Sequence, residues 1–275
     1  MTELVYDIGM GDGDDSLFYL LKGFRVVAVE ADPSLCDAAR VRLWAFIEKG
    51  QLTIVNRAVV AKAGPATLHR SSTPGWGTVV ENWHRYNVAH GVAADSIVVD
   101  GATLAELVKV DDPPFYLKID IEGMDRAALD SLAATTVRPR YISIETSFER
   151  SPTMASISSE FATLAKLGYD RFKIVDQARV PEQVPEKPAR MGKYIPYTFS
   201  DSASGMFGEE APGEWQSAHA ALLSFRQRCR KHWLPLLLHR KTRLYPHYVG
   251  IMVRLFGHSP NLGWYDIHAK HSSVE

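Results

Sequence analysis

The stretch LVYDIGMGDG, residues 4–13, decides the fold that this 275-residue chain is expected to adopt. Its first half, Leu4–Ile8, is a short apolar run typical of a buried strand. Gly9, Gly11 and Gly13 follow at alternate positions, and glycine lets a backbone pass close to a ligand in conformations that a Cβ atom forbids. A helix is predicted directly afterwards, and the free N–H groups of its first turn would face the same ligand. The stretch therefore predicts a strand, a ligand-binding turn and a helix.

The next predicted strand, Arg25–Glu30, ends in an acid about 20 residues beyond the turn, where a carboxylate can accept hydrogen bonds from both hydroxyls of a ribose. Both dinucleotides and S-adenosylmethionine are bound by this combination. A dinucleotide fingerprint requires glycines at positions 1, 3 and 6, but the sixth position counted from Gly9 is Asp14. The turn is also rich in acids, which suit a cation better than a pyrophosphate: Asp7, Asp12, Asp14 and Asp15. The sequence thus favours S-adenosylmethionine over NAD, and a turn that binds nothing is the alternative.

Beyond these elements, β-branched runs alternate with helical patterns. Strands are predicted at Leu52–Val60, Phe115–Ile121, Tyr141–Glu145, Arg171–Val175 and Trp264–Ala269, and helices at residues 16–22, 124–133 and 158–167. Another helix is predicted to run through residues 35–47, with Pro33 in its first position and Asp32 as its cap. Residues 66–100 are predicted to form shorter strands and loops. Strands separated by helices form right-handed βαβ units, which build a mostly parallel sheet covered on both faces. The expected fold class is therefore α/β, with a doubly wound, Rossmann-like sheet.

Composition excludes several classes of protein. A hydrophobic content of 46% with a net charge of −1 argues against disorder. No apolar run approaches the ~20 residues that cross a bilayer, and the first residues lack the basic and apolar regions of a signal peptide. Cys36 and Cys229 make no disulfide framework. We therefore expect a soluble, cytoplasmic protein.

Charge is distributed unevenly along the chain. Residues 1–214 hold 22 Lys and Arg against 30 Asp and Glu, whereas residues 215–265 hold eight basic residues and no acid. Such a segment predicts an anionic partner, either a nucleotide-linked or lipid-linked glycan acceptor or a membrane surface contacted through residues 226–256. The alternative is a solvated basic face matched to the acidic part of the chain, within one copy or across a homodimer. No known nucleic-acid-binding motif accompanies the patch, so nucleic acid is not an expected partner.

The chain resembles class I S-adenosylmethionine-dependent methyltransferases of the FkbM type. The resemblance rests on VYDIGMGDGDD with VVAVEADP, on YLKIDIEGMDRAALDSL with YISIE, and on SGMFGEEAPGEW with the terminal GWYDIHA. It covers most of the chain in the right order, and Leu117–Gly123 is its most specific part. The chain departs from the family at Asp12, where Asn is common, and at Asp125, where Glu is usual.

This resemblance implies methyl transfer from S-adenosylmethionine to a hydroxyl group, most often of a sugar or a secondary metabolite. It implies that the glycine turn holds the methionine portion, that Glu30 holds the ribose and that the stretch after the third strand lies near the adenine. The cofactor-binding residues expected on this basis are Asp7, Gly9, Gly11, Asp12, Gly13, Glu30, Ala31, Asn56, Ala58 and Asp120. The resemblance also implies an antiparallel last strand. The Rossmann-like domain would then span residues 1–180 and 262–275, and residues 181–261 would form a basic lid that selects the acceptor.

The predicted strand Phe115–Ile121 supplies the candidate reaction centre. Ligands of an open α/β sheet bind beyond the carboxyl ends of its strands. Asp120 and Glu122 end or follow this strand, and Glu145 ends the next one. A hydroxyl is a weak nucleophile, so a carboxylate or histidine at hydrogen-bond distance would take its proton. We expect Asp120 or Glu122 to orient the acceptor or act as the base, assisted by Glu145.

Other assignments of these residues stay open. His84 and His90 are alternative bases or ordinary surface residues, and Glu145 is alternatively an acid that caps a neighbouring helix. Asp120 and Glu122 could also bind a divalent cation, although no His/Cys cluster supports a transition metal. At the level of function, the rivals are an NAD-dependent oxidoreductase on the same fold and a non-catalytic module that binds a sugar or a membrane.

Overall fold

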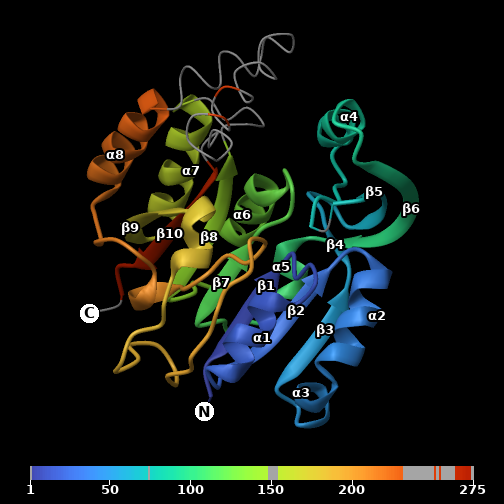
Figure 1. The fold of residues 1–275 in the computed structure, drawn as a ribbon, viewed down its shortest axis with the longest axis horizontal. Helices are drawn as coiled ribbons and strands as arrows, with labels where there is room; N and C mark the ends of the chain where they lie inside the picture. Colours follow the sequence, from blue (N-terminus) through green and yellow to red (C-terminus); the bar gives the residue numbers. More distant parts are fainter. Residues whose placement is uncertain are drawn as a thin grey trace.

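Seven strands form one sheet at the centre of the molecule (Figure 1). The computed structural model describes residues 2–73, 75–147, 154–231, 251, 254 and 264–273. In spatial order the strands are β3 (Leu52–Asn56), β2 (Arg25–Glu30), β1 (Leu4–Ile8), β7 (Tyr116–Ile119), β8 (Tyr141–Ser147), β10 (Trp264–His271) and β9 (Tyr169–Asp176). Their pairs are parallel, except that β10 runs antiparallel to both of its neighbours. The expected Rossmann-like sheet with an antiparallel last strand is confirmed.

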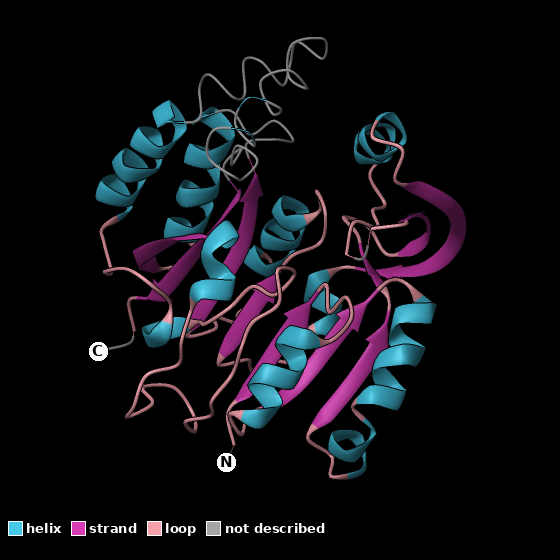
Figure 2. Ribbon diagram, in the orientation of Figure 1, coloured by secondary structure: helices cyan, strands magenta, loops and turns pink. Residues whose placement is uncertain are grey.

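Helices cover both faces of this sheet (Figure 2), because its strands carry apolar side chains on both faces. On one face pack α6 (Asp125–Ala133), α7 (Met154–Lys166) and α8 (Ala218–Lys231). On the other pack α1 (Asp14–Leu21), α2 (Pro33–Arg42) and α3 (Trp44–Glu48). The predicted helix over 35–47 is thus two helices that meet at Leu43. As predicted, Asp32 caps α2, and its carboxylate accepts a hydrogen bond from Ser34 N at 2.8 Å.

A second, three-stranded sheet lies beyond the carboxyl ends of β1–β3. It consists of β4 (Ala58–Val59), β6 (Ala93–Ala102) and β5 (Gly64–Ser71), and α4 (Glu81–Ala89) connects β5 to β6. The single strand predicted at Leu52–Val60 is wrong, because the chain leaves the main sheet at Arg57. There the Asn56 amide donates to the carbonyl oxygens of Glu30 and Ala31, at 2.9 and 3.0 Å. This contact ends the ladder between β2 and β3. A short helix, α5 (Leu104–Leu107), follows the second sheet.

The segment from residue 177 to residue 217 packs on the same face as α1. It contains two 3₁₀ turns, η1 (Gln177–Glu182) and η2 (Gly208–Glu210). Its Phe207 is fully buried and stacks on Tyr116, with ring centroids 4.3 Å apart. A buried ion pair of 2.8 Å joins its Glu210 to Lys22 of the segment after α1. The first part of the predicted lid is therefore a packed layer of the domain, and residues 232–250 lie outside the described residues.

The stacking of Phe207 yields a stability prediction. Phe207→Ala removes a fully buried ring, so we expect it to lower the free energy of unfolding by about 3–5 kcal/mol. Leu223→Ala, at a side chain that is 47% exposed on α8, should change it by only about 0.5 kcal/mol. Urea denaturation followed by tryptophan fluorescence measures both. Equal losses in the two variants would show that the 177–217 segment is not part of the core.

Candidate active site

A cavity of about 370 Å³ opens at the carboxyl ends of β1, β2 and β7. This is the switch point of the sheet, where the chain order reverses between β1 and β7. The main sheet contributes one wall, which includes Gly9, Gly11, Asp12, Glu30, Ala31, Lys118, Asp120 and Glu122. The second sheet and its connecting loop contribute the opposite wall, which includes Arg70, Ser71, Ser72, Thr73, Gly77, Thr78, Val79 and Asp95. The cavity therefore lies between the two sheets.

The glycine turn is shaped by close approach to the end of β7. Gly9, Gly11 and Gly13 have φ angles of +85°, +58° and +85°, a region that favours glycine. A Cβ atom on Gly9 would lie 1.8 Å from the carbonyl oxygen of Asp120. Gly13 caps the start of α1 and does not line the cavity. The turn thus presents its backbone to the cavity at Gly9 and Gly11.

Glu30 ends β2 with its carboxylate at the cavity wall. One oxygen accepts a hydrogen bond from Gly11 N at 2.9 Å, and the other accepts one from Asp32 N at 2.8 Å. Burial raises the pKa of Glu30 to about 7, and these backbone donors only partly oppose that rise. Ala58 lines the cavity nearby, whereas Asn56 lies outside the lining and fixes the chain behind Ala31. Glu30 is therefore held between the turn and the second wall, and the pKa of its carboxyl group lies close to neutral pH.

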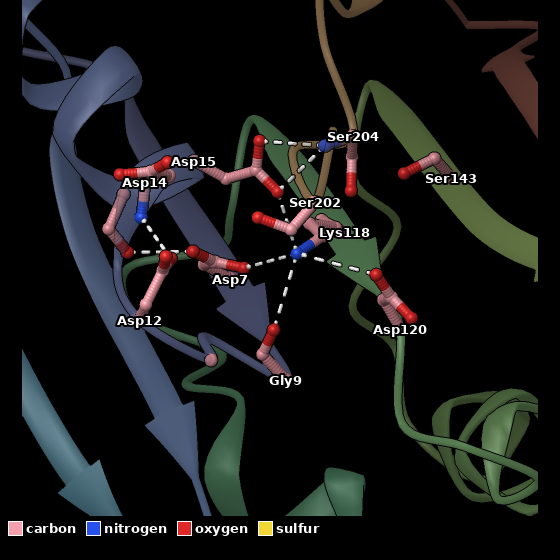
Figure 3. A network of polar contacts seen from close by, with 12 residues as sticks. Asp7, Gly9, Asp12, Asp14, Asp15, Lys118, Asp120, Ser143, Ser202 and Ser204 are labelled. Carbon is pink, nitrogen blue, oxygen red and sulfur yellow. Dashed lines mark hydrogen bonds and ion pairs between the residues drawn. The ribbon is translucent and has the colours of Figure 1, made fainter. Parts of the chain in front are cut away.

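Behind the turn, the buried Lys118 contacts three carboxylates (Figure 3). Lys118 Nζ lies 3.2 Å from Asp7, 2.9 Å from Asp15 and 3.7 Å from Asp120, and it donates to the Gly9 carbonyl oxygen at 3.2 Å. Burial lowers the pKa of Lys118, but the three carboxylates outweigh burial and hold it well above its usual value. Asp7 is fully buried and does not line the cavity. Asp7 thus lies behind the cavity wall, in contact with a lysine that lines it.

The turn after β7 brings Asp120 and Glu122 into the cavity wall. The Asp120 side chain is 30% exposed, and Glu122 is buried with a φ of +41°, which is unusual for a residue with a Cβ atom. The Thr78 hydroxyl donates to the Glu122 carbonyl oxygen at 2.8 Å. A Cβ atom on Gly123 would lie 2.1 Å from the indole nitrogen of Trp83. The second sheet and α4 therefore fix the turn that carries both carboxylates.

The other predicted catalytic residues lie outside the cavity lining. Glu145 faces Asp266 in the register between β8 and β10, outside the cavity lining. His84 stacks on His69 with ring centroids 4.0 Å apart, and His90 stacks on Tyr86, both also outside the lining. The cavity lining therefore includes Asp120 and Glu122 and does not include Glu145, His84 or His90. In the described part of the chain, no group of three or more His, Cys, Asp or Glu side chains is arranged to hold a metal ion.

Several cavity residues were missed by the sequence reasoning. The sequence did indicate that Lys118 is paired with acids, because a lysine in the apolar run YLKID must find buried partners if that strand is central. Arg70 pairs with Asp95 through Nε at 2.8 Å, and Thr78 clamps Glu122. Arg70 lies on β5 and Thr78 lies in the loop after it, a region for which the sequence predicted only shorter strands and loops. Ser202 brings the 177–217 segment to the cavity edge.

Gly9 and Gly11 form a matched pair for mutation. Gly9→Ala forces the turn away from Asp120, whereas a Cβ atom on Gly11 meets nothing within 4 Å. We expect Gly11→Ala to cost about 1–2 kcal/mol of stability, since alanine would occupy a left-handed conformation, and Gly9→Ala to cost clearly more. Chemical denaturation measures both losses. Equal values would show that the turn can move away from β7 freely.

The ionisation of Glu30 predicts how ligand affinity depends on pH. Ribose hydroxyls donate hydrogen bonds to an ionised carboxylate, and with a pKa of about 7 the ionised form is lost as pH falls. Between pH 8 and pH 6 we expect S-adenosylhomocysteine to bind about tenfold more weakly in calorimetric titration. Glu30→Gln should bind weakly at both pH values, and Glu48→Gln, at an exposed residue of α3, should behave as wild type. An affinity that does not change with pH in the wild type would contradict the role of Glu30.

Solved structures with similar folds include methyltransferases from three organisms. Precorrin-6y C5,15-methyltransferase of Geobacter metallireducens is 13% identical with a TM-score of 0.39, and the match covers 99% of this chain and 82% of that chain. An S-adenosylmethionine-dependent methyltransferase of Geobacter sulfurreducens, in complex with S-adenosylhomocysteine, is 13% identical with a TM-score of 0.39, and the match covers 98% and 85%. A proposed RNA methyltransferase of Pyrococcus horikoshii is 13% identical with a TM-score of 0.37, and the match covers 63% of this chain and 62% of that chain. No curated protein matches the chain.

A family match decides between the cofactor classes that the glycine turn left open. The model of the methyltransferase FkbM domain matches residues 7–171, which is more than half of the chain. The match begins at the glycine turn and includes Glu30, the second sheet and the end of β7, so the matched region contributes to both walls of the cavity. The chain belongs to the FkbM family of S-adenosylmethionine-dependent methyltransferases.

Proposed function

We propose that this protein transfers a methyl group from S-adenosylmethionine to a hydroxyl oxygen of a sugar or a secondary metabolite. The observation that carries the proposal is the presence of two carboxylates, Asp120 and Glu122, in the same cavity as the glycine turn and Glu30. A hydroxyl acceptor needs a group that takes its proton, whereas the cofactor itself needs none. Glu122 is therefore assigned to the acceptor side of the cavity, and Asp120, whose carbonyl oxygen lies against Gly9, is assigned to the boundary between the acceptor and the cofactor.

The cavity wall fits the proposed cofactor. Glu30 offers carboxylate oxygens to ribose hydroxyls, and at Gly9 and Gly11 the turn presents its backbone and no side chain to the cavity. The lining contains eight acids against three Lys and Arg residues, so its electrostatic field favours a cationic ligand. When bound, S-adenosylmethionine supplies a methyl carbon made electrophilic by its sulfonium. The protein's share of the reaction is then to orient the acceptor, exclude water and receive one proton.

The opposite wall suits an acceptor with several hydroxyl groups. Ser71, Ser72, Thr73 and Thr78 all line it. Ser71 and Ser72 both donate to the Val92 carbonyl oxygen, and Thr78 donates to that of Glu122. Ser71 and Thr78 also accept hydrogen bonds from Thr73 N and Val80 N. A hydroxyl oxygen has two lone pairs, so each of these oxygens can still accept a hydrogen bond from a ligand. This wall and the two carboxylates together support a polyhydroxylated acceptor.

The charged residues of the cavity favour different binding places for the two ends of an anionic acceptor. Arg70 pairs with Asp95, Arg57 with Asp100, and Lys118 with three carboxylates. These cations are engaged, so we propose that the reacting sugar unit is uncharged. A phosphate-linked carrier would contact the basic residues of the 226–256 segment, most of which are outside the described residues. Contact of that segment with a membrane is a further part of this proposal. In the described part of the chain, no helix is long and apolar enough to span a membrane.

Isotope transfer tests the reaction class. The protein is incubated with S-adenosylmethionine labelled at the methyl group and with a panel of neutral pyranosides, phenols and matched amines, and the product is examined by NMR. We expect an O-methyl product. Asp120→Asn combined with Glu122→Gln should lower kcat by about 10²–10⁴-fold. Asp130→Asn, at an exposed residue of α6, should leave kcat unchanged. Methyl transfer to nitrogen or carbon, or an unchanged kcat in the double variant, would contradict the proposal.

A further inference from the structure

Lys118 is a charged residue in the most buried part of the sheet. It lies on β7 between Asp7 of β1 and Ser143 of β8, its partners in the strand register. The exposed fractions of Asp7, Lys118 and Ser143 are 0%, 3% and 1%. All three face the side of the sheet covered by α1 and the 177–217 segment. Figure 3 shows Lys118 near Ser204, which belongs to that segment. Burying a lysine here is costly unless its ammonium is fully paired.

Two of the four partners of Lys118 are fixed by other parts of the protein. Asp7 accepts a hydrogen bond from the Ser16 hydroxyl at 2.7 Å. Asp15 accepts Ser204 N at both oxygens, at 2.9 and 3.1 Å. These two carboxylates anchor the ammonium to α1 and to the 177–217 segment. They would hold it in place whether or not a ligand were bound.

The other two partners belong to the cavity wall. The Asp120 carboxylate lies 3.7 Å from Nζ, and the Gly9 carbonyl oxygen accepts from Nζ at 3.2 Å. Both residues line the cavity, and so does Lys118. A carboxylate and a carbonyl oxygen each have lone pairs beyond the one used by Lys118. With three carboxylates around one ammonium, the cluster also keeps an excess of negative charge.

We propose that Lys118 is a positioning residue that orients the Asp120 carboxylate and the Gly9 carbonyl oxygen to accept the α-ammonium of the cofactor's methionine end. Lys118 acts through these two acceptors and does not touch the reacting atoms. The inference rests on the cofactor assignment and is independent of which acceptor is methylated. It separates the two ends of the cofactor, because Glu30 and the second sheet hold the nucleoside end without Lys118.

Two ligands distinguish this role from a merely structural one. S-adenosylhomocysteine carries the amino-acid end, whereas 5′-methylthioadenosine has the same nucleoside and thioether without it. In calorimetric titration, Lys118→Met should weaken S-adenosylhomocysteine binding at least tenfold, about 1.4 kcal/mol. Binding of 5′-methylthioadenosine should stay within twofold of wild type. Lys118→Arg, which keeps the charge, should recover most of the lost affinity.

Lys22 provides a matched control. It is also buried, at 1% exposure, and pairs with one acid, Glu210 at 2.8 Å, but it does not line the cavity. Lys22→Met should leave the ratio of the two affinities at its wild-type value. If circular dichroism shows that Lys118→Met does not fold, Lys118→Gln, whose amide can still donate to the same acceptors, gives the comparison, with a smaller but still selective loss expected.

Two outcomes would overturn the proposal. Equal weakening of both ligands by the Lys118 variants, or no weakening of either, would show that Lys118 only stabilises the fold. Absence of S-adenosylhomocysteine binding in the wild type would overturn the cofactor assignment and this inference with it. These results are distinguishable, because the first concerns a ratio of affinities and the second concerns the wild type alone.

Discussion

The close contact between Gly9 and the end of β7 is the constraint on which the site depends. The turn after β1 lies so near the Asp120 carbonyl oxygen that no side chain fits between them. β1 and β7 are parallel neighbours at the switch point of the sheet, so the ends of both strands open into one crevice. Any displacement of the turn would separate the proposed cofactor wall from the carboxylates of Asp120 and Glu122. Position 9 requires glycine for two reasons: a Cβ atom there would clash with the Asp120 carbonyl oxygen, and the φ angle is +85°.

The buried charges follow from the same contact. Bringing Asp7, Asp15 and Asp120 to one point costs free energy unless a cation is present, and Lys118 supplies it from the neighbouring strand. In many proteins, apolar side chains in place of such a buried charge cluster give an equally stable fold. Stability alone therefore does not explain why this protein has the cluster. A cluster that keeps negative charge and reaches a cavity is better explained by a cationic ligand.

The second sheet and the 177–217 segment complete the site from opposite sides. Thr78 and Trp83 clamp the turn that carries Glu122, while Ser204 holds Asp15 against Lys118. The second wall of the cavity is thus made by the insertion between β3 and β7, within the region matched by the family model. The C-terminal insertion, expected to cover the site, reaches the cavity at Ser202 within the described residues. We therefore propose that the second sheet contributes most to the selection of the acceptor.

Local patterns in the sequence were enough to predict the main sheet, the glycine turn, Glu30 and the cap of α2. Strand periodicity, a left-handed glycine and an Asp-Pro cap are decided by residues close together in the chain. The tertiary structure alone decided that the third strand breaks at Arg57, that His84 and Glu145 lie outside the cavity lining, and that Lys118 meets Asp7. Lys118 and Asp7 are 111 residues apart. Such contacts depend on how whole strands and helices pack, and no local pattern encodes that packing.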